Sequence, residues 1–176
     1  VLDFGRSESR RQRFRWTTAS LAPLVEREVQ RFRRASGLGA AHMELEIAAN
    51  LPAVMHDPDA FREVLTNLLS NAYKYSPPDD RRLRVTLGSQ GGRGMLGGRV
   101  VLAVEDNGPG VAPRERRKIF EQFYRSEDLL TSEIEGTGLG LSLSYDIIKT
   151  HGGELKVETK EGEGSEFNVI LPNIKT

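Results

Sequence analysis

The stretch Glu63-Val-Leu-Thr-Asn67-Leu-Leu-Ser-Asn71-Ala-Tyr-Lys74-Tyr75 has the pattern of a helix with two different faces. Asn67, Asn71 and Lys74 recur at helical spacing on one face. The i, i+3, i+4, i+7 spacing of a buried stripe is carried by Leu65, Leu68, Leu69 and Ala72. Because amides compete with the backbone for hydrogen bonds, two asparagines in mid-helix need a reason beyond helix propensity. We therefore expect a packed helix that presents two amides and an ammonium on one side.

The flanking residues indicate where this helix begins and ends. Asp57-Pro58 is typical of an N-cap followed by proline at the first helical position. Pro77 and Pro78 predict an end near Ser76, because the residue before a proline disfavours the helical conformation.

Periodicity in the rest of the chain predicts further helices and five strands. An apolar stripe that follows Ser20, a candidate cap, predicts a helix up to Gly37, and a second helix is expected from about residue 139 to Thr150. Pro113 is expected to open a short basic helix that runs into residues 119–125, with a mobile loop at 126–135. Strands are predicted at residues 43–47, 82–88, 99–105, 154–159 and 165–171.

The order of these elements favours an α/β two-layer sandwich over a doubly wound parallel sheet, since the strands mostly neighbour one another in sequence. The glycine cluster at residues 91–98 could be a phosphate loop or a hairpin connection. The hairpin is favoured, because no helix follows the cluster.

The composition is that of a soluble globular protein. At 176 residues the chain is long enough for one domain with a core, and 38% of its residues are hydrophobic and 28% charged. The 25 basic and 25 acidic residues cancel, so no overall field attracts nucleic acid or an anionic membrane. No cysteine is present, which excludes disulfides and thiolate metal sites. Because the chain opens at Val1 without an initiator methionine, we expect it to be part of a longer protein.

Asn71 is a candidate ligand for Mg²⁺, because an amide oxygen is a hard, neutral donor and Mg²⁺ takes most of its ligands from phosphates and water. Lys74, one turn further on, could reach the same phosphates as a point charge. The alternative is that Asn67 and Asn71 only cap or bridge neighbouring loops.

The segment Asp106-Asn-Gly-Pro-Gly110 follows an apolar strand. A carboxylate at the mouth of an apolar pocket can accept a hydrogen bond from the amino group of adenine, while Gly108 and Gly110 let the backbone approach the ring. A plain turn explains an Asp-Asn-Gly sequence as well.

The segment Gly136-Thr-Gly-Leu-Gly140 precedes a predicted helix, so its backbone N–H groups and the helix N-terminus could bind an anion. It is not the dinucleotide fingerprint, because Leu141 occupies the position of the third glycine, and no GxxxxGK[ST] phosphate loop occurs in the chain.

These motifs, in this order, resemble the ATP-binding catalytic domain of bacterial sensor histidine kinases, within the superfamily that also holds gyrase B, Hsp90 and MutL. Residues 67–71 match the N box, 106–110 the G1 box, 120–123 the F box and 136–141 the G2 box. Further matches are His151-Gly-Gly and the closing Gly164-Ser-Glu-Phe, so the resemblance runs from about residue 20 to the end.

The resemblance implies a Bergerat-type α/β (α+β) sandwich, with a mostly antiparallel five-stranded sheet, helices on one face, and a lid between the F and G2 boxes. It implies ATP and Mg²⁺ as ligands. Asn71 would hold Mg²⁺, Lys74 and Arg125 would face phosphates, Tyr75 would line the nucleotide, Asp106 would bind adenine, and Phe123 would pack under the lid. Asn67, Asn71 and Lys74 are the implied catalytic residues. The other implied cofactor-binding residues are Gly108, Gly110, Gly136, Thr137, Gly138, Leu139, Gly140 and Leu141.

Two departures from the family pattern qualify this implication. Hydrolytic relatives carry a catalytic glutamate where this chain has Asn67, and an amide is a poor general base, which favours phosphoryl transfer over hydrolysis. Glu63 nevertheless keeps a carboxylate one turn away. In addition, none of His42, His56 and His151 lies in an acceptor-histidine context, so each is expected to be structural and the isolated chain is not expected to phosphorylate itself.

We therefore expect residues 1–15 to be the remnant of a dimerisation helix and linker, and residues 16–176 to be a histidine kinase catalytic domain. The expected partners are a dimerisation domain outside this chain and a response regulator, with no nucleic acid. The isolated domain is expected to be a monomer and the full protein a homodimer, located in the cytoplasm either free or as the cytoplasmic part of a membrane-anchored sensor. The alternatives are a hydrolytic ATPase of the same superfamily and a non-catalytic nucleotide-binding module.

Overall fold

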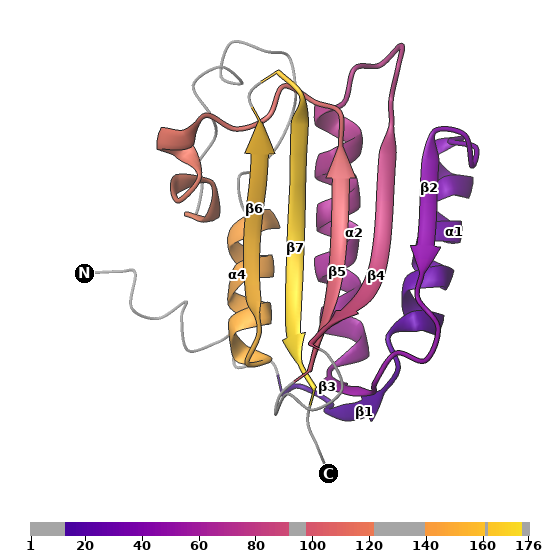
Figure 1. The fold of residues 1–176 in the computed structure, drawn as a ribbon, viewed down its shortest axis with the longest axis vertical. Coiled ribbons are helices and arrows are strands. Elements are labelled where there is room, and N and C mark those ends of the chain that lie inside the picture. Colours follow the sequence, from indigo (N-terminus) through magenta and orange to yellow (C-terminus); the bar gives the residue numbers. More distant parts are fainter. Residues whose placement is uncertain (1–12, 92–97, 122–139, 161, 174–176) are drawn as a thin grey trace.

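The asparagine helix, α2 (Pro58–Tyr75), packs on one face of a five-stranded sheet (Figure 1). This computed structural model describes residues 13–91, 98–121, 140–160 and 162–173. The other helices are α1 (Ala22–Ser36), α4 (Gly140–Thr150) and two single 3-10 turns, η1 (Pro113–Glu115) and η2 (Lys118–Phe120). The strands are β1 (Thr17–Ala19), β2 (Met43–Ile47), β3 (Val54–His56), β4 (Leu83–Gln90), β5 (Arg99–Asp106), β6 (Glu154–Lys160) and β7 (Gly164–Pro172).

The sheet has the strand order β2-β4-β5-β7-β6 and is mostly antiparallel, as predicted. The exception is β2, which pairs with β4 in parallel, Met43 opposite Leu83. This pairing follows from the chain path, because α2 lies between the two strands in sequence and a helical crossover returns the chain in the same direction. β4 and β5 pair from Gln90–Arg99 onward, which confirms the hairpin, although residues 92–97 lie outside the described part.

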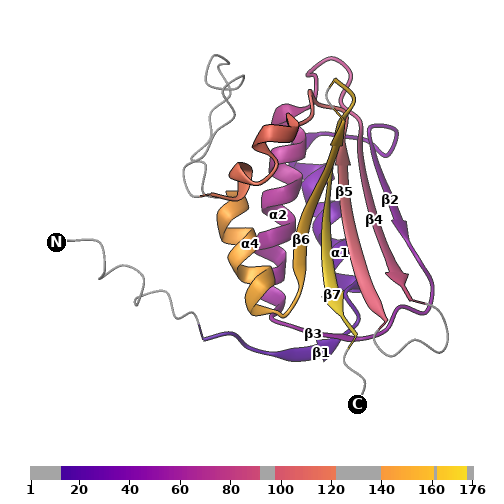
Figure 2. The ribbon, with the colours of Figure 1, turned by 60° about the vertical axis from the view of Figure 1, so that its left-hand side comes forward.

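Helices α1, α2 and α4 cover one face of the sheet. In the part of the chain that the structure describes, no helix covers the opposite face (Figure 2). The predicted apolar stripe of α2 is buried: Leu65 is fully buried and Leu68 is 1% exposed. Asp57 caps the helix through Oδ1, which accepts from the backbone N–H groups of Asp59 and Ala60, both at 2.9 Å.

Two local predictions need correction. The basic segment after Pro113 forms the two 3-10 turns rather than one helix, because so short a segment gains too few hydrogen bonds to offset nucleation. The structure also contains a second sheet, in which β1 and β3 pair in antiparallel fashion, Thr17 opposite His56. Each of these strands is three residues long, too short to show periodicity in the sequence.

The predicted cap of α1 is shifted by one residue. Leu21 and not Ser20 occupies the N-cap position, although the hydroxyl of Ser20 accepts from the backbone N–H of Ala22 at 3.2 Å. Gly37 ends the helix with φ 72°, the left-handed conformation typical of a C-cap. Among the described helices, none is long and apolar enough to cross a membrane.

Candidate functional site

The motifs that the sequence singles out meet at one end of the sheet. Helix α2 ends there at Tyr75, β5 ends there at Asp106, and β7 begins there at Gly164, at the upper end of the view in Figure 1. The register places Asp106 opposite Ser165 of β7. Residues 75, 106 and 164, far apart in sequence, therefore surround one corner of the fold.

Asp106 is a buried carboxylate, 8% exposed, that points into this corner. Its Oδ1 accepts a hydrogen bond from the backbone N–H of Gly108 at 2.8 Å. Burial raises the pKa of Asp106 to about 6, although backbone N–H groups of Gly108 and Ser165 counteract part of the rise, and Glu105 adds to it. At neutral pH the group is mostly ionised, so it is a strong acceptor for a neutral N–H donor.

Two glycines allow the backbone to pack tightly around Asp106. A Cβ on Gly108 would lie 2.7 Å from the carbonyl oxygen of Tyr75 and 2.8 Å from Oδ1 of Asp106. A Cβ on Gly164, whose φ is 121°, would lie 2.0 Å from the carbonyl oxygen of Asp106. No larger residue fits at either position without a backbone shift, so these glycines bring the end of α2 and the start of β7 against Asp106.

The turn after Asp106 is tied down on both sides. The side chain of Asn107 accepts from the backbone N–H of Arg82 at 3.0 Å and donates to the carbonyl of Asp80 at 2.7 Å. On the other side, the backbone N–H of Val111 donates to the hydroxyl of Thr159 at 2.7 Å. The turn is therefore held in place independently of any ligand.

On α2, Asn71 is half-buried and Lys74 is exposed. Among the described residues, neither the Asn71 amide nor the Lys74 ammonium makes a hydrogen bond or an ion pair. Tyr75, also half-buried, contributes the backbone oxygen that lies against Gly108. Asn71 and Lys74 are thus available to a ligand, whereas Tyr75 already shapes the corner.

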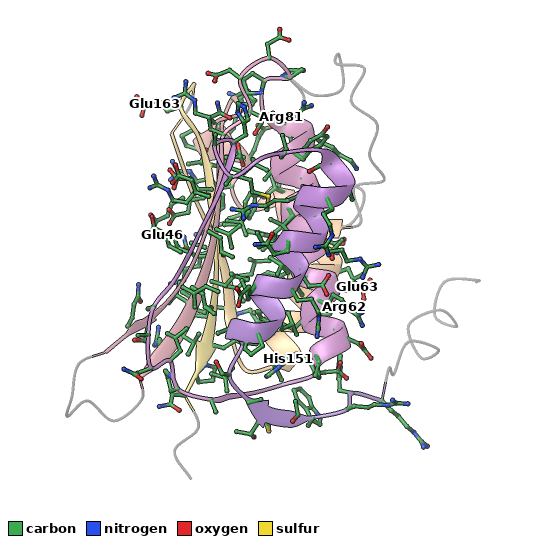
Figure 3. All side chains as sticks on the ribbon, turned by 90° about the vertical axis from the view of Figure 1, so that its right-hand side faces the viewer. Glu46, Arg62, Glu63, Arg81, His151 and Glu163 are labelled. Carbon is green, nitrogen blue, oxygen red and sulfur yellow. The ribbon has the colours of Figure 1, made fainter. Side chains whose placement is uncertain are left out.

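Asn67 behaves differently from Asn71. Its Nδ2 lies 3.3 Å from the carbonyl oxygen of Gly140 and 3.3 Å from the hydroxyl of Ser144, both in the first turns of α4. Of the two alternatives for the paired asparagines, bridging a neighbouring element therefore describes Asn67. Glu63 lies one turn earlier, on the side of α2 that faces away from the sheet (Figure 3).

Only the end of the second glycine turn can be placed. Gly140 is the first residue of α4, and the half-buried Leu141 packs against the core. The remaining predicted site residues fall outside the described ranges: Phe123, Arg125, Gly136, Thr137, Gly138 and Leu139.

The structure adds two polar residues that the sequence reasoning missed. The backbone N–H of Ser165 donates to the Asp106 carboxylate, and the Ser165 hydroxyl lies 3.2 Å from that of Thr159. Thr159 also donates to the carbonyl of Gly164 at 3.0 Å. A signal was present, because Ser165 is a polar residue on the buried face of β7, whose other members are Phe167, Val169 and Leu171.

The two buried histidines, His56 and His151, make hydrogen bonds within the fold, as expected of structural residues. A ring nitrogen of His56 lies 2.9 Å from the carbonyl of Val54. His151, at the end of α4 in Figure 3, has both ring nitrogens in hydrogen bonds. His42 is exposed, and its Nδ1 lies 3.3 Å from the carbonyl of Arg81.

Comparison with known proteins supports the resemblance. A family model described as histidine kinase-, DNA gyrase B-, and HSP90-like ATPase matches residues 56–175. The alginate biosynthesis sensor protein KinB of Pseudomonas aeruginosa is 32% identical over 177 residues, covering 98% of this chain and 27% of KinB. The circadian input-output histidine kinase CikA of Synechococcus elongatus is 29% identical over 175 residues, covering 98% of this chain and 22% of CikA. The chain thus spans about a quarter of the length of these two relatives.

Solved structures agree with this assignment. The mycobacterial sensor histidine kinase MprB matches with a TM-score of 0.69 at 28% identity, covering 93% of this chain and 99% of the MprB chain. Full-length ShkA, solved in complex with AMPPNP, matches with a TM-score of 0.70 at 27% identity, covering 93% of this chain and 32% of ShkA. The chain therefore belongs to the histidine kinase-, DNA gyrase B- and HSP90-like ATPase family, as an ATP-binding catalytic domain of the sensor histidine kinase type.

Proposed function

We propose that this chain binds ATP with Mg²⁺ and donates the γ-phosphoryl group to a histidine of a dimerisation domain, from which an aspartate of a response regulator receives it. The observation that carries the proposal is the buried Asp106 carboxylate, enclosed by Gly108 and Gly164. The carboxylate accepts from the backbone N–H groups of Gly108 and Ser165 and has lone pairs for a further donor, and the amino group of adenine is a neutral donor of suitable size.

The residues around this corner fit a nucleotide. At Gly108 no side chain stands against the Asp106 carboxylate, since a Cβ there would lie 2.8 Å from Oδ1 of Asp106. Asn71 and Lys74 lie on the neighbouring end of α2, without a described partner, and provide a hard oxygen and a positive charge. When bound, Mg²⁺ would supply charge neutralisation at the phosphates, and Asn71 is the residue that would hold it.

The protein's own contribution to such a transfer is positioning and electrostatics. Asp106 would fix the base, and Lys74 would oppose phosphate charge. We assign to Tyr75, Gly110, Arg125 and residues 136–141 the roles that the resemblance implies, and to Asn67, which contacts Gly140 and Ser144, a role in positioning α4. Residues 16–176 would form the domain, monomeric alone and part of a cytoplasmic or membrane-anchored homodimer in the full protein.

Titration with a fluorescent ATP analogue tests the nucleotide part of the proposal. We expect Mg²⁺-dependent, saturable binding that Asp106→Asn abolishes. Asp80→Asn is the matched control, because Asp80 is exposed and paired with Arg82 at 3.0 Å near the same turn. Binding that is unaffected by Asp106→Asn, or independent of Mg²⁺, would contradict the proposal.

Transfer is tested by adding the separately purified dimerisation domain of the full protein and ATP labelled at the γ-phosphate. We expect label on the dimerisation domain only when both proteins are present. Labelling of this chain alone on a histidine would overturn the assignment of the acceptor to another domain. Steady phosphate release that Glu63→Gln abolishes would instead favour a hydrolytic ATPase.

A further inference from the structure

Asn67, Gly140 and Ser144 form a closed hydrogen-bonded triangle between α2 and α4. The Nδ2 atom of Asn67 lies 3.3 Å from both the carbonyl oxygen of Gly140 and the hydroxyl of Ser144. The hydroxyl of Ser144 in turn donates to the carbonyl of Gly140 at 2.8 Å. The triangle thus joins the middle of α2 to the first turn of α4.

The chemistry of the three groups fixes the orientation of the Asn67 amide. A carbonyl oxygen can only accept, so the amide nitrogen and not the amide oxygen must face Gly140. The Ser144 hydroxyl gives its proton to Gly140 and can therefore accept from the Asn67 nitrogen. The Asn67 amide nitrogen is thus shared between two acceptors of α4.

The surroundings make this contact specific. Ser144 is completely buried, so its hydroxyl depends on partners inside the protein. A Cβ on Gly140 would be in ordinary contact with Asn67, 3.6 Å from its Cγ, so the start of α4 lies directly against the Asn67 side chain. Further along α4 the contacts are apolar instead of hydrogen-bonded, since Ile147 and Ile148 are buried in the hydrophobic core.

We propose that Asn67 and Ser144 are a pair of positioning residues that set the place of the α4 N-terminus relative to Asn71 and Lys74. This inference rests on the proposed function, because the start of α4 is the part of the proposed phosphate site that the structure describes. A helix N-terminus binds an anion through N–H groups with fixed directions, so rotation of the first turn of α4 would misplace them. Asn67 then contributes to ATP binding by acting on α4 through its amide nitrogen.

Ser144→Ala tests the pair without touching the nucleotide. The change removes the hydroxyl but leaves a small residue in the buried position, and we expect ATP-analogue affinity to fall roughly three- to tenfold, as for the loss of one or two hydrogen bonds. Asn67→Ala is expected to weaken binding by at least as much. The double variant should lose less than the product of the two single effects, because the two residues act through one contact.

Ser36→Ala is the matched control. The hydroxyl of Ser36 donates to the carbonyl of Phe32 at 2.7 Å, the same bond four residues back along a helix that Ser144 makes to Gly140. Ser36 ends α1, away from the proposed site, so its variant should bind the ATP analogue like the unaltered chain. A loss in Ser36→Ala equal to that in Ser144→Ala would show that any such helix bond has this effect and would overturn the proposal.

Hydrogen exchange without nucleotide separates this inference from the proposed function. We expect Ser144→Ala and Asn67→Ala to speed amide exchange in residues 143–146 by about tenfold or more, and to leave residues 147–150 close to the unaltered chain. If the unaltered chain binds no ATP while this exchange pattern appears, the proposed function fails and the contact stands. Unchanged exchange and unchanged ATP affinity in Ser144→Ala, or fully additive effects in the double variant, would overturn the positioning role.

Asn67→Asp distinguishes positioning from direct chemistry. The substitution keeps the shape of the side chain but turns a carboxylate oxygen toward the Gly140 carbonyl, so that two acceptors face each other. We expect faster exchange at residues 143–146 and weaker ATP binding. Tighter binding or a rise in ATP hydrolysis with unchanged exchange would show instead that residue 67 acts on the nucleotide directly.

Discussion

The backbone N–H of Asp57 donates a hydrogen bond to Nε2 of His151, 3.0 Å away, and so joins the start of α2 to the end of α4. Because Nε2 accepts, the proton of the neutral ring must be on Nδ1, which lies 2.7 Å from the carbonyl of Ile147. The segment before β1 packs on the same joint. The rings of Phe14 and Trp16 lie 5.3 and 4.6 Å from that of His151, and the backbone N–H of Arg15 donates to Asp57 Oδ2.

His151 should make the stability of the fold depend on pH near neutrality. Burial lowers the pKa of His151 below 6.5, although the Ile147 carbonyl and Asp57 oppose this effect. The unfolded chain therefore takes up a proton near pH 6.5 that the folded chain takes up only at lower pH, so this contribution to stability is lost as the pH falls below 6.5. We expect the dependence to approach about 1.4 kcal/mol per pH unit at its steepest.

Urea denaturation between pH 8 and pH 5, with the unaltered chain and His151→Gln compared at each pH, measures this effect. Glutamine can still accept from Asp57 but does not titrate, so the difference between the two chains should shrink as the pH falls. The comparison is needed because Asp106, whose pKa is raised to about 6, contributes with the opposite sign between pH 3.8 and 6. A constant difference across this range would contradict the prediction.

The sequence predicted those helices and strands whose buried faces follow from local hydrophobic periodicity. The stripe of α2, with Asp57-Pro58 before it and Pro77 after it, determines a helix whose buried face and capping residue the structure confirms. The five long strands likewise follow from their alternating or continuous apolar residues. Local periodicity indicates which side of a helix or strand is buried, and these buried sides together form the hydrophobic core.

The sequence did not predict contacts between residues that lie far apart in the chain. Asn67 and Asn71 are the same residue type one turn apart, but only Asn67 lies opposite Gly140 and Ser144, which are more than 70 positions away in the chain. The joint between Asp57 and His151 and the pairing of β1 with β3 depend on the same kind of encounter. No spacing within α2 could separate a residue that holds α4 from one that is free to hold a ligand.

Asp106→Asn should stabilise the fold while it removes nucleotide binding. At pH 7 the folded chain holds an ionised carboxylate whose pKa, about 6, lies above the ordinary 3.8, which corresponds to a cost of up to about 3 kcal/mol. Asparagine keeps an oxygen that can accept from Gly108 and carries no charge. Urea denaturation at pH 7 should show a gain of about 1 to 3 kcal/mol in the free energy of unfolding, against about 0.5 kcal/mol or less for Asp80→Asn. Equal or lower stability of Asp106→Asn would be inconsistent with a costly buried charge.

ATP should lower the pKa of Asp106. An adenine amino group donates to the ionised carboxylate and not to its protonated oxygen, so binding favours the charged form. Following the carboxyl carbon of Asp106 by NMR from pH 4 to pH 8, we expect an apparent pKa of about 6 in the free chain and a clearly lower value at saturating ATP. An Asp106 pKa that rises on ATP binding would mean that the base does not donate to this carboxylate.

Gly108→Ala should destabilise the chain, whereas Gly88→Ala should not. The new methyl group at residue 108 would lie 2.7 Å from the Tyr75 carbonyl and 2.8 Å from Asp106 Oδ1, so the end of α2 and the turn after β5 must move apart. We expect a loss of about 1 to 3 kcal/mol, typical of overpacking. Gly88 lies within β4 with nothing within 4 Å of the position of a Cβ, so alanine there should leave stability unchanged or raise it by up to about 1 kcal/mol. Chemical denaturation of both variants measures the contrast, and similar losses at the two positions would show that the close approach at Gly108 does not hold in solution.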